Sequence, residues 1–187
     1  EGWMPFGRVF ETLTWGRRHV VMGANQIDRY GNQNLSAFGP LQHPSRQMFG
    51  VRGAPGNTIN HATSYWVGNH SKRVFCDEVD IVSGIGWDKV DPGNPAYRFA
   101  DIHQVVTNFG VFDFGGPGHT MRALSLHPGV EPDEVAANTS FDVHGLADAE
   151  RTRLATMDEL TLIRERIDPK TLRDKEVTLP NRNRGTA

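Results

Sequence analysis

The sequence predicts one mixed α/β domain with a helical tail at its C-terminus. Three observations predict this class: short β-rich runs alternate with turn residues, a helix with a complete capping signal stands near the C-terminus, and no internal repeat interrupts the chain. The length of 187 residues suits one ordinary domain with a real core. The 20 glycines and 11 prolines indicate a fold that is rich in turns.

The first predicted elements are two short strands joined by a polar turn. Residues 18–24 (RHVVMGA) form an apolar run, and residues 35–38 form a second one. The segment between them carries Gly31 and Asn32, residue types that tolerate a positive φ where the chain reverses. We therefore expect a positive φ at Gly31.

Two uncharged amides stand directly after the first apolar run. The side chains of Asn25 and Gln26 could donate hydrogen bonds to a ligand. They could equally connect the turn to its neighbours. The sequence leaves both interpretations open.

A glycine-rich loop leads into a predicted short helix. Glycines recur at every third position of residues 50–56, and Asn57 is placed to cap a helix over residues 58–66. Backbone N–H groups of such a loop can approach a carbonyl or phosphate closely, and Arg52 suits a phosphate or carboxylate. A purely structural turn explains the spacing equally well. The two segments supply the candidate binding residues Asn25, Gln26, Gly50, Arg52, Gly53 and Asn57.

The second half of the chain continues with strands. Residues 73–76, 79–82, 102–109 and 111–114 are β-rich and predict strands. The glycines of residues 115–118 could approach a ligand, but a reversal between two strands explains them as well.

A helix near the C-terminus is predicted from its capping signal. Thr156 and Glu159 form a Thr-x-x-Glu capping box, and apolar residues follow at spacings of three and four. The helix is expected to end at Asp168-Pro169. Residues 181–187 hold no apolar residue except the last alanine, so we expect this tail to fray.

Composition excludes several classes of protein. The net charge of −2 provides no basic field for nucleic-acid binding. The single cysteine, Cys76, excludes an internal disulfide framework and indicates a cytoplasmic protein; its place in an apolar run predicts a buried, inert thiol. No apolar run is long enough to span a bilayer, and no signal peptide is recognisable, so we expect no membrane contact. Because the sequence starts at Glu1, we expect the natural chain to be longer.

The common catalytic signatures are absent. The sequence contains no P-loop, no His-Glu-x-x-His and no Gly-x-Ser-x-Gly motif. Its eight histidines are scattered without ligand spacing, so we expect no metal site. The acidic residues at 77–80 fit a solvated strand end. No residue is by itself a convincing acid, base or nucleophile, so we assign no catalytic residue to this chain.

Three segments, taken in order, resemble the β-type subunit of the class I coenzyme A transferase family. Residues 23–34 (GANQIDRYGNQN) are similar to the family's Gly-Ala-x-Gln-x-Asp-x-x-Gly-Asn-x-Asn segment, the glycine loop follows in place, and residues 127–141 look like its Pro-Gly-Val, Glu-Val and Thr-x-Phe segment. The resemblance implies that residues 1–187 form one coenzyme A transferase-like domain, an open sheet flanked by helices. It also implies a hetero-oligomer with an α-type subunit, of α2β2 stoichiometry, with the active site at the subunit boundary.

A narrower resemblance concerns one branch of this family. Residues 1–6, 46–53 and 112–117 look like the β-subunits of actinobacterial hydrolases that open the last steroid ring. This implies hydrolysis of a carbon–carbon bond in a steroid-derived acyl-CoA during cholesterol catabolism, with a glutamate of the α-subunit as the base. Coenzyme A would be part of the substrate, and no further cofactor is implied.

Two departures from the family pattern bear on this interpretation. Arg52 stands where the transferases have the middle glycine of Gly-x-Gly-Gly, which favours the hydrolase branch. The family also has an N-terminal segment before the equivalent of Glu1, and in glutaconate-type transferases the catalytic glutamate lies there. Two alternatives stay open: an acyl-CoA:carboxylate CoA-transferase that works through a glutamyl thioester, and a noncatalytic scaffold subunit that orders its partner.

Overall fold

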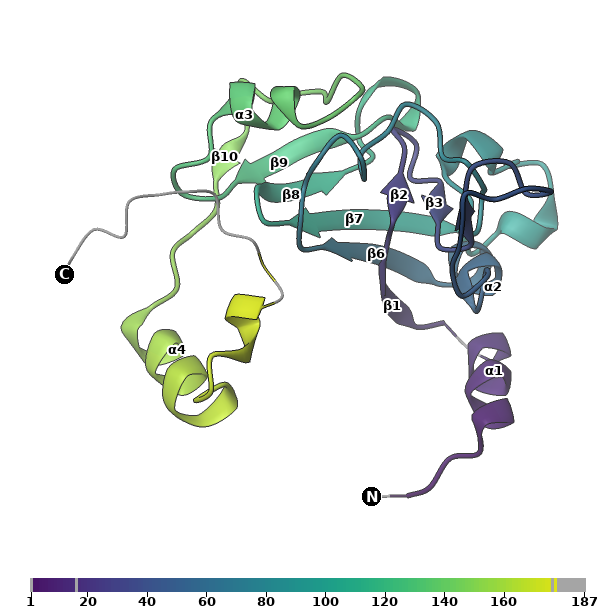
Figure 1. Ribbon diagram of the computed structural model, residues 1–187, viewed down its shortest axis with the longest axis horizontal. Coiled ribbons are helices and arrows are strands. Elements are labelled where there is room, and N and C mark those ends of the chain that lie inside the picture. Colours follow the sequence, from purple (N-terminus) through teal and green to yellow (C-terminus); the bar gives the residue numbers. More distant parts are fainter. Residues whose placement is uncertain (1, 16, 176, 178–187) are drawn as a thin grey trace.

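A six-stranded sheet forms the centre of the molecule (Figure 1). The computed structural model describes residues 2–15, 17–175 and 177. The strand order is β1-β6-β7-β8-β9-β10; β1, β6 and β7 are parallel, β7, β8 and β9 form an antiparallel meander, and β10 lies parallel to β9. The strands are β1 (His19–Gly23), β6 (Ala62–Val67), β7 (Asp101–Thr107), β8 (Gly110–Asp113), β9 (Arg122–Leu126) and β10 (Glu150–Arg151). The expected open α/β sheet is confirmed.

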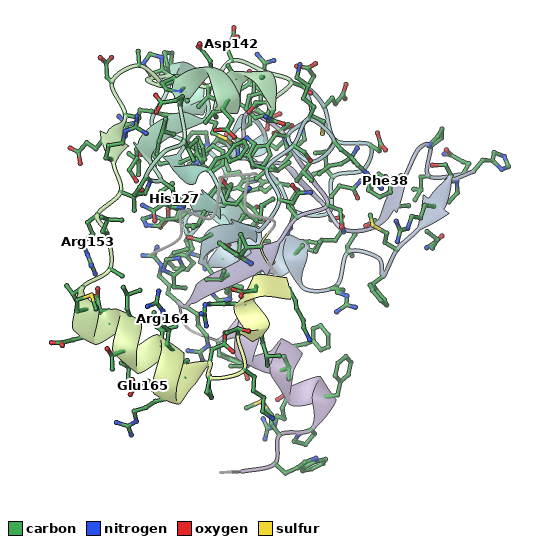
Figure 2. All side chains as sticks on the ribbon, turned by 60° about the vertical axis from the view of Figure 1, so that its left-hand side comes forward. Phe38, His127, Asp142, Arg153, Arg164 and Glu165 are labelled. Carbon is green, nitrogen blue, oxygen red and sulfur yellow. The ribbon has the colours of Figure 1, made fainter. Side chains whose placement is uncertain are left out.

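Two small hairpins lie between β1 and β6 in the chain. The first pairs β2 (Gln26–Ile27) with β3 (Gln33–Asn34) and lies against the sheet, where the Tyr65 hydroxyl donates to the carbonyl of Gly31 at 3.2 Å. The second pairs β4 (Ala37–Phe38) with β5 (Arg46–Gln47). Figure 2 shows this second hairpin standing out from the body, with Phe38 at its root. We call residues 37–49 the arm.

The helices are short and flank the sheet. They are α1 (Phe6–Thr14), α2 (Ala54–Asn60), α3 (Pro132–Ala137) and α4 (Met157–Leu162), and α4 continues into the π-helical turn η4 (Ile163–Ile167). Single 3-10 turns are η1 (Trp87–Lys89), η2 (Pro95–Tyr97), η3 (Pro117–His119) and η5 (Leu172–Lys175). Figure 1 shows α1 and α4 standing off the sheet at opposite ends of the molecule, whereas α2 and α3 lie close to it.

The core lies where the first hairpin and the loop after β6 cover the sheet. Its largest fully buried side chains come from every part of the chain between β2 and α3, because the sheet presents alternate residues to this layer. They include Ile27, Tyr65, Phe75, Ile102, Val105, Phe112, Met121, Leu126 and Val135. The core therefore fixes the first hairpin, and with it the segment that leads into the arm.

Several sequence-based predictions are confirmed. Gly31 has a φ of +86°, and residues 101–107 and 110–113 are strands. The capping box is complete: the Glu159 N–H donates to the Thr156 hydroxyl at 3.2 Å, and the Thr156 N–H donates to the Glu159 carboxylate at 2.8 Å. The helical segment that begins after this box ends at Asp168, as expected.

The predicted partners of the first strand are wrong. Residues 18–24 do contain β1, but β1 pairs in parallel with β6, and residues 35–38 contribute to the arm instead. The predicted helix over residues 58–66 is also wrong, since α2 begins at Ala54 and residues 62–67 are β6. Pro55 in the first turn favours the earlier helix start, and the run Ala-Thr-Ser-Tyr-Trp-Val favours a strand. Asn57 therefore lies inside the helix and does not cap it.

Two predicted strands after β6 are loops. In residues 73–76 only Phe75 forms a bridge, with Ile27, and residues 79–82 form none. Both sides of β6 are already paired, with β1 and β7, so these runs have no ladder to join and bury Phe75 and Val79 from a loop. Residues 115–118 connect β8 to β9, as a reversal should. The tail over residues 181–187 lies outside the described residues.

Two further expectations concern membranes and metals. In the part of the chain that the structure describes, no helix combines the length and apolarity that crossing a bilayer requires. Over the same residues, no three histidine, cysteine or acidic side chains converge as metal ligands would.

Candidate functional site

Asp28 organises the tight turn of the first hairpin. Its carboxylate accepts hydrogen bonds from the N–H of Tyr30 at 2.9 Å, the N–H of Asn32 at 3.0 Å and the Asn32 side-chain amide at 2.8 Å. The Asn32 side chain also donates to Asp88 at 2.7 Å and accepts from the N–H of Gly86 at 2.8 Å. Burial raises the pKa of Asp28, although these hydrogen bonds act in the opposite direction. The carboxylate is committed to holding the turn.

The two amides after β1 have different roles. The Gln26 side chain is buried, and its oxygen accepts from the Asn34 amide at 2.6 Å and from the N–H of Asp80 at 3.1 Å. Asn25 is exposed and uses its backbone N–H to bond the Asn34 carbonyl at 3.1 Å. Gln26 therefore connects the turn to its neighbours, and Asn25 is the amide that faces solvent.

A pocket of about 250 Å³ opens at the carboxyl ends of β1 and β6. Ligands of α/β proteins bind outside the carboxyl ends of parallel strands, because loops of several strands converge there. The pocket is lined by Gly23, Ala24, Asn25, Leu35, Trp66, Val67, Gly68, Asn69 and Val74. Its two side-chain amides, Asn25 and Asn69, can orient a polar group beside the Trp66 ring.

The glycine loop forms the second part of the candidate site. Gly50 has a φ of +77° and Arg52 a φ of +50°, so the chain turns through the left-handed region twice before α2. The space beside Gly50 is open, because nothing lies within 4 Å of the position that a Cβ would take. The Arg52 guanidinium lies over the Phe49 ring, 4.5 Å from its centre. Gly53 precedes α2 and accepts the N–H of Asn57 at 2.9 Å through its carbonyl.

Asn57 connects the glycine loop to the strand that ends at the pocket. Its side-chain amide donates to the sulfur of Met22 in β1 at 3.1 Å. Its side-chain oxygen is buried and has no hydrogen-bond partner within the described residues. A buried amide oxygen without a partner is unusual in a folded protein. Asn57 is thus the predicted site residue whose bonding is incomplete.

The predicted site residues therefore fall into two neighbouring groups. Asn25 belongs to the strand-end pocket, whereas Gly50, Arg52 and Gly53 form the loop before α2, and the Asn57–Met22 contact joins the two parts. The sequence analysis did not identify Trp66 and Asn69. The Gly68-Asn69 pair after an aromatic β-rich run was the signal, and the helix wrongly predicted over residues 58–66 obscured it.

Three other groups with reactive chemistry prove to be structural. Asp77 bonds Arg29 at 3.4 Å, and Asp80 accepts the N–H of Gly39 at 2.8 Å, so the acidic cluster holds loops. Burial raises the pKa of the half-buried Cys76 thiol to about 11, which fits the expected inert thiol.

His70 is the third group, and it is buried against aromatic rings. Its ring nitrogens share hydrogen bonds with the hydroxyls of Thr107 at 3.2 Å and Thr139 at 2.9 Å, and its ring stacks on Phe75 with 3.7 Å between the centres. Burial lowers the pKa of His70 to about 3. His70 is therefore neutral at physiological pH and joins β7 to the segment after α3.

Comparison with known proteins gives a consistent set of relatives. No protein-family model matches the chain. Over 95% of its length, the chain is 76% identical to the cholesterol ring-cleaving hydrolase IpdB subunit of Mycobacterium tuberculosis, of which it covers 71%. It is 73% identical over 96% of its length to the IpdB subunit of Rhodococcus jostii, again covering 71%. One of the subunits of glutaconate CoA-transferase from Acidaminococcus fermentans is 30% identical over 80% of the chain and 57% of its own length.

Solved structures agree with these relatives. The crystal structure of Rhodococcus jostii RHA1 IpdAB matches 96% of the chain with a TM-score of 0.92 and 73% identity, over 72% of the matched chain. Glutaconate coenzyme A-transferase from Acidaminococcus fermentans matches 87% of the chain with a TM-score of 0.71 and 28% identity, over 62% of its chain. The fold expected from the coenzyme A transferase resemblance is confirmed.

Proposed function

The chain belongs to the family of cholesterol ring-cleaving hydrolase IpdB subunits, and from this membership we propose that it is the β-type subunit of a heteromeric hydrolase that opens the last ring of a steroid-derived acyl-CoA. The observation that carries the proposal is the 76% identity over 95% of the chain. The structural match to IpdAB supports the same assignment over 96% of the chain. An α-type subunit completes the proposed enzyme.

The proposed reaction is hydrolysis of a carbon–carbon bond next to a ring ketone. A carboxylate of the α-type subunit takes a proton from water, and the resulting hydroxide adds to the ketone carbon. Collapse of the adduct breaks the ring bond, which leaves a carboxylic acid on one side and a carbanion on the other. A neighbouring carbonyl stabilises the carbanion as an enolate, which then takes the proton back from the acid. Atoms balance with the consumption of one water, and we propose that no further cofactor takes part.

In this scheme the chain binds and orients the substrate. The strand-end pocket offers Asn25 and Asn69 as polar contacts beside Trp66. The glycine loop offers backbone N–H groups, and Arg52 suits an anionic group of the thioester. No catalytic residue is assigned to this chain, because its buried carboxylate, Asp28, is engaged in the turn. This division of labour supports a base on the partner subunit.

The decisive experiment separates hydrolysis from transfer. The chain is produced together with an α-type subunit and given a CoA thioester that carries the last steroid ring, without any carboxylate acceptor. We expect a ring-opened product that has gained one water. Product that appears only when acetate or succinate is added, with CoA moved to that acid, would establish a transferase instead. Equal turnover by the α-type subunit alone would reduce this chain to a scaffold.

A further inference from the structure

The arm exposes large apolar side chains. Leu41 is 67% exposed and Phe49 is 83% exposed, although both belong to a segment with defined backbone structure. Figure 2 shows that the arm projects away from the core and not along its surface. The apolar side chains of the arm thus have no part of their own core to cover them.

The arm has few interactions to hold it in place. Its ladder joins only Ala37 to Gln47 and Phe38 to Arg46. At its root, the N–H of Gly39 donates to Asp80 at 2.8 Å, and the Arg73 guanidinium lies 5.5 Å from the centre of the Phe38 ring. Beyond Gly39, every hydrogen bond found within the described residues joins two residues of the arm or its immediate flank. An isolated two-stranded hairpin is at best marginally stable in water.

The composition of the arm is that of an interface. Protein–protein interfaces are enriched in aromatic residues, methionine and arginine, and depleted in lysine, glutamate and aspartate. The arm reads AFGPLQHPSRQMF: it has two phenylalanines, a methionine and an arginine, and no lysine, glutamate or aspartate. Pro40 and Pro44 restrict its backbone, which lowers the entropy lost on docking.

The charge of this region selects the kind of surface that it fits. No aspartate or glutamate occurs between Asp28 and Asp77, although the whole chain has a net charge of −2. Arg46 and Arg73 form no ion pair within the described residues, so their charges are available to another molecule. The complementary surface is therefore apolar at its centre and acidic around it.

We propose that the arm is the element by which this chain docks onto the α-type subunit of its hydrolase. The inference rests on the proposed function for the existence of that subunit. Phe49 and Leu41 become buried in an apolar hollow of the partner, and Arg46 pairs with carboxylates at its rim. Because the glycine loop follows the arm directly at Gly50, docking also places this loop at the subunit boundary.

The first test measures assembly of the two full subunits. Dissociation constants are determined by analytical ultracentrifugation for the wild type and for Phe49→Ala and Arg46→Glu. We expect each substitution to weaken assembly at least tenfold, since truncated anchors at interfaces have effects of this size. Phe6→Ala and Arg166→Glu are matched controls: Phe6 is 79% exposed, Arg166 is also exposed, and neither lies in the arm. Unfolding curves of the separate chains confirm that every variant is folded.

The second test needs no variant. Hydrogen–deuterium exchange is measured for the chain alone and in the complex, and we expect slower exchange of the arm amides only with the partner present. Assembly and activity that survive both arm substitutions would overturn the arm proposal and leave the hydrolase intact. Slower exchange caused by coenzyme A alone, or by self-association of this chain, would also overturn it. Failure of the wild-type chain to bind any α-type subunit would refute both proposals.

Discussion

Gly31 is the position where the structure predicts the largest effect of a single methyl group. It has a φ of +86°, and a Cβ there would stand 2.7 Å from Cζ of Phe114 and 2.8 Å from Cγ2 of Ile102. The backbone term for a non-glycine residue in this region is about 1–2 kcal/mol. Both neighbours are buried, so they cannot swing away, and overpacking a core adds roughly 1–3 kcal/mol. We therefore expect Gly31→Ala to lower the free energy of unfolding by about 2–5 kcal/mol.

Gly118→Ala is the matched control for this prediction. Gly118 has a φ of +64°, but nothing lies within 4 Å of its missing Cβ, so only the backbone term of about 1–2 kcal/mol applies. Urea unfolding of both variants gives the two free energies, and thermal midpoints shift by roughly 2–4 °C per kcal/mol for a chain of this size. Equal losses in the two variants would refute the packing argument, and an unchanged Gly31→Ala would refute the strain argument as well.

Three further predictions concern pH, a helix cap and turnover. Because burial lowers the pKa of His70 to about 3, the unfolded chain binds its proton first on acidification; the stability that neutral His70 provides is complete above about pH 6.5 and falls by about 1.4 kcal/mol per pH unit below it. Urea unfolding at pH 7.5 and 5.5 should show a smaller difference in His70→Gln, and an equal one would contradict the assignment. Thr156→Ala removes a cap worth about 1 kcal/mol and should speed amide exchange in α4 without moving the global unfolding transition, because α4 stands off the sheet; a shifted global transition would show that α4 is integrated into the core. Gly53→Val should keep assembly with the α-type subunit but lower turnover about 10²–10³-fold in a mass-detected hydrolysis assay, whereas full activity would make the glycine loop a structural turn.

Local signals in the sequence predicted local structure correctly. The capping box at Thr156 and the positive φ at Gly31 depend on neighbours within a few residues, and both are present as predicted. The pairing of β1 could not be predicted, because its partner β6 lies beyond two hairpins and a helix. The sequence therefore suggested the nearest apolar run, at residues 35–38, which builds the arm instead.

The candidate site was predicted in part for the same reason. Asn25 and the glycine loop were visible as short motifs, whereas Trp66 and Asn69 join the site only through the β1–β6 pairing. Gln26 has the residue type of a ligand contact but is used to bond Asn34 and Asp80. Which amide faces a ligand and which one connects loops depends on burial, and a single sequence does not report the burial of one residue.

The parallel pairing of β1 with β6 also has a consequence for how the chain folds. Val21 of β1 aligns with Ser64 of β6, so the pair forms only after both hairpins and α2 have been gathered between them. Closing so long a loop is entropically slow, whereas β7, β8 and β9 join neighbours in the chain and can form early. In synthesis the order is reversed, since β1 leaves the ribosome before any partner exists. We expect the nascent chain to present the apolar segment Val20–Met22 unpaired until β6 emerges, which makes this stretch the point where a chaperone would engage it.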